Sequence, residues 1–245
     1  MWAALSVATR SIRVHQVFAS ASYNAQLCST TMSAKRPRLL CLHGSRSNAE
    51  VTEMQCTLLG LDEFGQGPCE CTYLTAPHET EEGFDKDIKN PRSWWIGGEM
   101  ESGLRSVVEH VMENGPYDGV YGFSQGSSVI TILSDQKVWH QLSGGSTQKP
   151  WRYAIFGCGT DYLLGQPSAP HVETPLDMPS LHVLGAQDHI LADSKSLTTR
   201  YKDPTILTIN SGHAIPITLQ DGSPGSTAVL QQVQSFIRAH DSASA

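Results

Sequence analysis

Acidic residues are missing from the first part of the chain, and long apolar runs are missing everywhere. Between Met1 and Ala49 there is no Asp or Glu, although the 245-residue chain carries a net charge of -7 at pH 7. A membrane-spanning helix needs about 20 consecutive apolar residues, so no transmembrane segment is expected. The negative net charge disfavours phosphate backbones and anionic membranes, so no nucleic acid partner is expected either.

Paired cysteines are also scarce. The chain has six cysteines and no C-x-x-C pair. Cys69 and Cys71 are two residues apart on one predicted strand, so their side chains share a face of that strand. Cys41 and Cys158 fall at predicted core strands. In a chain of this length, such a pattern favours small buried side chains in a reducing compartment over a disulfide framework. No metal site is predicted from these residues.

The acid-free leader, residues 1–34, is Ser-rich and bears Arg10 and Arg13 with apolar residues at helical spacing. This composition resembles an organelle transit peptide, which would place the protein in a mitochondrion or plastid. Two alternatives leave the protein cytoplasmic: the leader is a disordered extension without an address, or translation starts at Met32. In each case we expect one folded domain over residues 35–241.

Apolar periodicity predicts alternating strands and helices along that domain. The predicted strands are 38–42, 69–74, 120–123, 151–156, 181–184 and 205–209, and the predicted helices are 48–59, 103–114, 126–133, 194–201 and 227–239. This alternation indicates an α/β fold with a mostly parallel sheet of about six strands and helices on both faces. The proline-containing stretch 161–178 is short, so we expect a modest cap or surface loop and no large lid domain.

The most informative motif is Gly122-Phe123-Ser124-Gln125-Gly126, which has the G-x-S-x-G form. It lies where a buried strand turns directly into a helix, the context of a nucleophile elbow in the α/β-hydrolase fold. Glycines on both sides permit the tight turn, and the turn lifts the serine hydroxyl clear of the sheet. The motif therefore predicts that Ser124 is a catalytic nucleophile.

A serine nucleophile needs a base within hydrogen-bond reach and a carboxylate that orients this base. Ser124, Asp188 and His213 follow the chain order expected for this fold, and each comes just after a predicted strand. Asp161 also follows a strand, but one position too early for the usual acid. His189, beside Asp188, is expected to point away from it.

Backbone N–H groups should stabilise the oxyanion. We expect these donors to be Gln125, at the start of the helix after the serine, and Ser45, in the loop after the first strand. The residues predicted near the strand ends are mostly apolar, and they would shape the substrate pocket: His43, Trp94, Trp95, Phe123, Leu163, Leu164, Ile190 and Ile215. Two adjacent tryptophans cannot point the same way, so one should anchor the loop and one should line the pocket.

With these motifs in place, the chain resembles the family of serine hydrolases first recognised in fungi, over roughly residues 37–240. The matching stretches are Leu40-Cys41-Leu42-His43-Gly44, Trp94-Trp95, Gly115-Pro116-Tyr117-Asp118-Gly119-Val120-Tyr121-Gly122-Phe123-Ser124-Gln125-Gly126, Gly185-Ala186-Gln187-Asp188 and Gly212-His213-Ala214-Ile215-Pro216. The resemblance implies hydrolysis of carboxylic esters or thioesters. Some relatives release polyketide acyl chains from a carrier protein, and another branch prefers long-chain alkyl esters.

The sequence departs from this family at Phe156-Gly157-Cys158-Gly159-Thr160, where relatives usually carry a Ser-Gly-Phe-like turn.

We expect a serine hydrolase that cleaves a small-molecule or carrier-bound ester or thioester with an apolar acyl group, through an acyl-enzyme on Ser124. The reaction requires no metal or organic cofactor. The alternatives are an acyl-protein or phospholipid-type esterase on the same fold, or a non-catalytic binding protein that kept the fold.

The leader generates a first prediction. Because residues 1–31 precede the first core strand and are acid-free, a chain that begins at Met32 should keep the Tm and kcat of the full-length protein. Thermal unfolding and ester turnover measure both quantities. Fusing the leader to a fluorescent reporter tests the address separately, and a diffuse cytosolic signal would contradict targeting.

Overall fold

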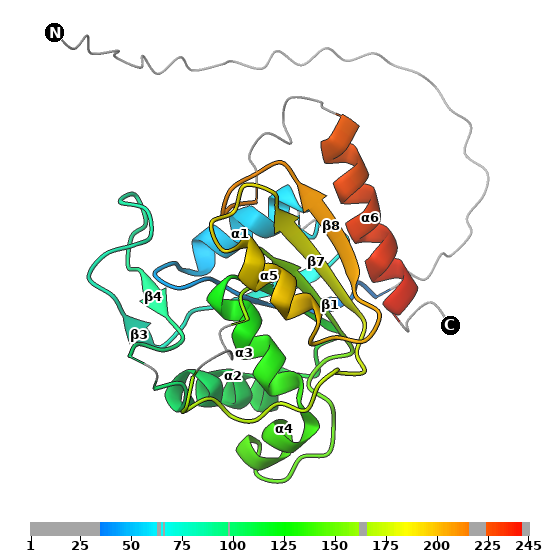
Figure 1. Ribbon diagram of the computed structural model, residues 1–245. Helices are drawn as coiled ribbons and strands as arrows, with labels where there is room; N and C mark the ends of the chain where they lie inside the picture. The colour runs from blue at the N-terminus through cyan, green and yellow to red at the C-terminus, as the bar shows by residue number, and fades with distance from the viewer. Residues whose placement is uncertain are drawn as a thin grey trace, which may run out of the picture. The chain divides into compact units, whose positions relative to one another are not determined.

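Six parallel strands form the centre of the fold in the computed structural model (Figure 1). The structure describes residues 35–62, 65, 67–97, 99–161, 166–215 and 224–241, so the leader lies outside the described residues. The strands are β1 (Arg38–Leu42), β2 (Glu70–Leu74), β5 (Gly119–Phe123), β6 (Tyr153–Gly157), β7 (Ser180–Gly185) and β8 (Thr205–Ile209). Their order, β2-β1-β5-β6-β7-β8, confirms the predicted α/β architecture.

Helices cover both faces of this sheet. They are α1 (Ala49–Leu58), α2 (Glu101–Asn114), α3 (Gln125–Ser134), α4 (Gln136–Leu142), α5 (Leu191–Thr198) and α6 (Pro224–His240). Leu40 and Leu42 pack in the core that α2, α3 and α4 cover, whereas Leu39 and Cys41 pack in the core that α1 and α6 cover. Side chains alternate across a strand, so β1 needs apolar residues at every position to fill both cores.

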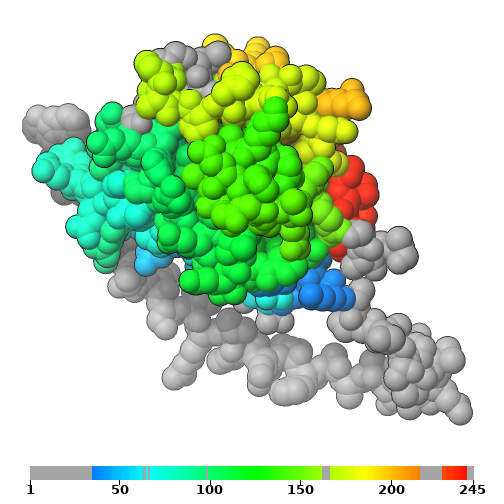
Figure 2. Space-filling model, turned by 90° about the horizontal axis from the view of Figure 1, so that it is seen from below, coloured from blue at the N-terminus to red at the C-terminus, as the bar shows by residue number. Residues whose placement is uncertain are grey.

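The segment with α2, α3 and α4, coloured green, forms most of the face seen in Figure 2. α4 was not expected from the sequence. Its N-cap is Asp135, whose side chain accepts hydrogen bonds from the N–H groups of Lys137 at 2.8 Å and Val138 at 3.0 Å. This cap separates α4 from α3 after only one residue, so the sequence pattern around it shows no clear boundary.

A small antiparallel hairpin is the second unexpected feature. Its strands, β3 (His78–Glu79) and β4 (Arg92–Ser93), are two residues each, which is too short for any periodicity to appear in the sequence. Between β6 and β7, the described residues of 158–179 contain no helix or named strand, as expected for a surface loop. Among the described residues, no helix is long and apolar enough to cross a membrane.

A close approach between β1 and α3 positions the site. A Cβ at Gly126, in the first turn of α3, would lie 2.5 Å from the carbonyl oxygen of Leu42 and 2.8 Å from that of His43. Such distances are far below van der Waals contact, so only glycine permits this packing. The N-terminus of α3 and the loop that follows β1 therefore meet at one edge of the sheet.

Candidate active site

Ser124 connects β5 to α3 with φ 47° and ψ -118°. A side-chain-bearing residue in this region of backbone space is strained by about 1–3 kcal/mol, and such strain concentrates at functional sites. Gly122, two residues earlier, also has to be glycine, because a Cβ there would lie 2.9 Å from the backbone nitrogen of Ser127. The motif thus folds as the sharp strand-to-helix turn that its sequence predicts.

His213 and Asp188 form a hydrogen-bonded pair. Nδ1 of His213 donates to Oδ2 of Asp188 at 2.8 Å, and the Asp188 carboxylate is fully buried. The other carboxylate oxygen, Oδ1, accepts from the backbone N–H of Ile190 at 2.9 Å. With the proton on Nδ1, Nε2 of His213 has a free lone pair, as a general base requires.

The expectation that His189 points away from Asp188 is wrong. Nδ1 of His189 lies 3.4 Å from Oδ1 of Asp188, and its ring meets that of His213 edge-on at a centroid distance of 5.2 Å. The turn after β7 folds back on itself, so adjacent residues of this turn face the same site. His189 was missed as a neighbour of the pair because strand-like alternation does not hold in a turn.

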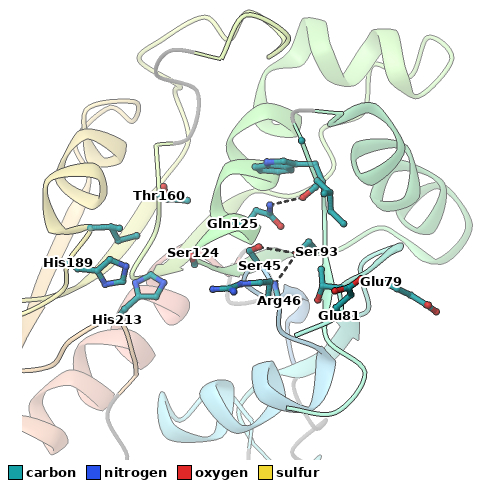
Figure 3. A pocket seen from close by; sticks show the side chains of 15 residues that line it. Ser45, Arg46, Glu79, Glu81, Ser93, Ser124, Gln125, Thr160, His189 and His213 are labelled. Carbon is teal, nitrogen blue, oxygen red and sulfur yellow. Dashed lines mark hydrogen bonds between the residues drawn. The ribbon is translucent and has the colours of Figure 1, made fainter. Parts of the chain in front are cut away.

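Ser124 and His213 line the same two cavities (Figure 3). Among the described residues no hydrogen bond joins the two side chains, although Phe123 packs against the His213 ring at 5.0 Å. In ligand-free hydrolases this bond is often long and tightens when substrate is bound. The arrangement places the Ser124 side chain and the His213 ring at one space, with the Asp188 carboxylate bonded to the far nitrogen of that ring.

Asp161 is engaged elsewhere. Its two carboxylate oxygens each accept from Nε of Arg200 at 3.1 Å, and Oδ2 also accepts from the hydroxyl of Ser196 at 2.9 Å. This buried ion pair ties the end of β6 to α5 and its following turn. Asp188 is therefore the carboxylate that accepts the hydrogen bond from His213.

His182, a core residue in β7, is buried, and burial lowers its pKa to about 3.

The two expected oxyanion donors lie on segments that Ser93 and Gln125 hold together (Figure 3). The Ser93 hydroxyl is 3.0 Å from the Ser45 hydroxyl and accepts from the backbone N–H of Arg46 at 3.0 Å. The Gln125 side chain accepts from the Trp94 N–H at 2.8 Å and donates to the Trp95 carbonyl at 3.2 Å. Both roles of these side chains were missed from sequence, since nothing local indicates them.

His43 and Trp94 do not line the pocket, so that expectation is wrong. Both are completely buried, and Nε1 of Trp94 donates to the His43 carbonyl at 2.7 Å. The backbone N–H of Ala76 donates to Nε2 of His43 at 3.0 Å, which leaves the ring proton on Nδ1, 2.6 Å from the Gly44 carbonyl. Burial lowers the pKa of His43 to about 4, so the ring is neutral and braces the loop behind the site.

Two cavities meet at Ser124. The larger, about 760 Å³, is lined by Trp95 and Ile190 among others, and the smaller, about 330 Å³, by Phe123. Trp95, Ile190 and Phe123 therefore line cavities that also contain Ser124, and their role in a substrate pocket stays a prediction. Ile215 is buried and lines neither cavity, so that prediction is wrong. Leu163 and Leu164 lie outside the described residues.

Cys158 is a neighbour of the acid–base pair that the sequence did not indicate. Its sulfur lies within 4.8 Å of ligand atoms of both Asp188 and His213, and its backbone has φ 43° just after β6. Burial raises the pKa of this thiol to about 12. The S–H group donates weakly to the carbonyls of Gly212 at 3.8 Å and Ala214 at 3.9 Å, so the thiol is engaged by the backbone that precedes and follows His213.

A parallel sheet with Ser124 on a tight turn after β5, and the hydrogen-bonded Asp188 and His213 after β7 and β8, has the α/β-hydrolase architecture. The family described as Serine hydrolase (FSH1) matches residues 32–223, and the chain belongs to this family. Esterase CG5412 of Drosophila melanogaster is 29% identical over 211 residues, covering 76% of this chain and 71% of the fly protein.

A second relative is longer than this chain. The uncharacterized hydrolase C22A12.06c of Schizosaccharomyces pombe is 28% identical over 210 residues, covering 75% of this chain and 48% of the yeast protein. Among solved structures, the RedJ thioesterase of Streptomyces coelicolor superposes with a TM-score of 0.53 at 13% identity, covering 83% of this chain and 91% of that one. At this identity, the superposition shows a likeness of fold alone.

The two carboxylates generate a second prediction. Asp188→Asn should fold with an unchanged Tm yet lose up to about 10⁴ in kcat, because the wrong histidine tautomer is then favoured. Asp161→Asn should instead lower the Tm, because Arg200 loses its partner, and should keep kcat. Thermal unfolding and ester turnover of both variants give the comparison. A mild Asp188→Asn and an inactive, stable Asp161→Asn would reverse the assignment.

Proposed function

We propose that this serine hydrolase cleaves carboxylic esters or thioesters through an acyl-enzyme on Ser124. The observation that carries the proposal is the 2.8 Å bond from His213 to the buried Asp188, which leaves Nε2 of the imidazole free beside the elbow serine. His213 takes the serine proton as general base and later returns a proton to the leaving group. Asp188 holds the required tautomer.

The tetrahedral intermediate carries a negative oxygen, which the backbone N–H groups of Ser45 and Gln125 would receive. Gln125 opens α3, and the first N–H groups of a helix have no partner within it. Donors fixed in this way need no rearrangement as charge develops, which is the main source of their effect. The hydrogen bonds of Ser93 and of the Gln125 side chain support this proposal, because they restrain both segments.

The acyl group is proposed to be apolar and to occupy the larger cavity. Trp95, Ile96 and Ile190 line this cavity, and the Thr160 hydroxyl on its wall already donates to Asp193. An acyl-protein or phospholipid-type esterase on the same fold is the rival enzyme, and chain-length selectivity separates the two. A small-molecule and a carrier-bound substrate both remain compatible with this cavity. A non-catalytic binding protein is disfavoured, because all three triad residue types are retained.

The nucleophile generates a third prediction. A fluorophosphonate probe should label Ser124, and Ser124→Ala should abolish both labelling and turnover, because loss of a triad serine costs about 10⁶ in kcat. Peptide mapping of the labelled protein identifies the modified residue. Labelling of another serine, or wild-type activity in Ser124→Ala, would disprove the assignment.

The cavity generates a fourth prediction. Each buried methylene contributes about 0.8 kcal/mol, so kcat/KM should rise severalfold for each pair of carbons until the cavity is full. The measurement is kcat/KM for esters of one alcohol with acyl chains from about two to sixteen carbons, a range wide enough to resolve that slope. A flat profile, or the highest activity on acetyl esters, would show that these apolar residues do not shape the acyl site.

A further inference from the structure

Arg46 stands at the mouth of the site on a backbone that is fixed from both sides. Its N–H donates to the Ser93 hydroxyl at 3.0 Å, and its carbonyl accepts from the Phe84 N–H at 2.9 Å. Its φ of 53° lies in the left-handed region. The side chain is exposed and extends from this loop toward the part of the site that holds Ser124 and His213 (Figure 3).

The Arg46 guanidinium makes no ion pair or side-chain hydrogen bond within the part of the chain that the structure describes. Other arginines near the strand ends are paired: Arg92 with Glu79 at 2.8 Å and Arg200 with Asp161 at 3.1 Å. Glu81 lines the larger cavity, yet it is not within ion-pair distance of Arg46. A permanent positive charge thus lies at this cavity without an ion-pair partner among the described residues, although Glu79 and Glu81 line the same cavity.

Arg46 also belongs to both cavities. The residues that line the two cavities in common are Ser45, Arg46, Ser124, His189 and His213. Ser124 and His213 are the proposed nucleophile and base, Ser45 carries a proposed oxyanion donor, and His189 lies beside Asp188. Of the five shared residues, only Arg46 has a permanent charge. A substrate whose carbonyl carbon reaches Ser124 therefore brings its neighbouring atoms close to this guanidinium.

We infer that Arg46 forms an anion subsite for a carboxylate or phosphate carried on the leaving group of the substrate. The inference rests on the proposed function and adds to it the chemical class of the leaving group. A guanidinium fork matches a carboxylate or phosphate through two parallel N–H donors. The acyl chain is proposed to occupy the larger cavity. The smaller cavity also contains Ser124 and Arg46, so it is the space left for the leaving group. Arg46, Phe84 and His189 are then the walls that the leaving group meets.

The test uses four matched thioesters, three of which share the same uncharged acyl chain. One leaving group is 3-mercaptopropionate, the second is its uncharged amide, and a third carries a phosphate in place of the carboxylate. A fourth thioester has the amide leaving group and a carboxylate at the far end of the acyl chain. The measured quantity is the ratio of kcat/KM for each charged thioester to kcat/KM for its neutral counterpart.

The wild-type enzyme should favour the thioester with a charged leaving group, and Arg46→Gln should lower that ratio by about tenfold or more, as for loss of a charge-assisted hydrogen bond. Arg46→Lys should restore part of the ratio, because it keeps the charge and loses the fork. Raising the ionic strength should lower the wild-type ratio. Comparing the carboxylate with the phosphate shows which anion the subsite prefers.

Arg105→Gln is the matched control. Arg105 is an exposed arginine on α2 that pairs with Glu101 and lines neither cavity, so its removal changes net charge equally and should leave the ratio unchanged. An equal fall in Arg105→Gln, an unchanged ratio in Arg46→Gln, or an Arg46 effect confined to the charged acyl chain would overturn the inference. Failure of the proposed function would look different, because the wild type would then not hydrolyse even the neutral thioester through Ser124.

Discussion

The contact between Gly126 and the end of β1 is the constraint on which the site depends. Any side chain at this position would force α3 away from the carbonyl oxygens of Leu42 and His43. The N–H groups of Ser45 and Gln125 lie on the two segments that this contact joins. A shift of about an ångström between these segments would misalign the two proposed oxyanion donors, which are useful only when they are already in place.

A second layer of residues maintains this geometry without facing the substrate. The neutral ring of His43 bonds both the Ala76 N–H and the Gly44 carbonyl, and Trp94 closes over it at a centroid distance of 5.2 Å. These contacts restrain the loop after β1 on its buried side, and the Ser93 hydroxyl restrains the same loop through Ser45 and the backbone N–H of Arg46. A protonated His43 would lose its acceptor nitrogen, so the depressed pKa is part of how the loop stays fixed.

The sequence was most informative where local structure and chemistry coincide. The elbow at Ser124 is a strand, a turn and a helix within ten residues, and the parallel topology then brings the ends of β7 and β8 to the same edge of the sheet. For this reason Asp188 and His213 were predicted to lie together. The pocket lining was predicted less well, because it depends on contacts between distant segments. The Trp94 indole, for example, donates to the carbonyl of His43, a residue 51 positions earlier in the chain, whereas Trp95 lines the larger cavity.

The backbone of Ser124 also has a consequence for how this protein can evolve. Its φ and ψ suit glycine, so Ser124, the proposed nucleophile, holds the chain in a conformation that destabilises the fold by about 1–3 kcal/mol. A glycine at this position would relieve the strain and leave a more stable, inactive protein. Selection for thermal resistance alone would therefore favour loss of the nucleophile, whereas selection for turnover retains the strained serine and must find stabilising substitutions elsewhere in the fold.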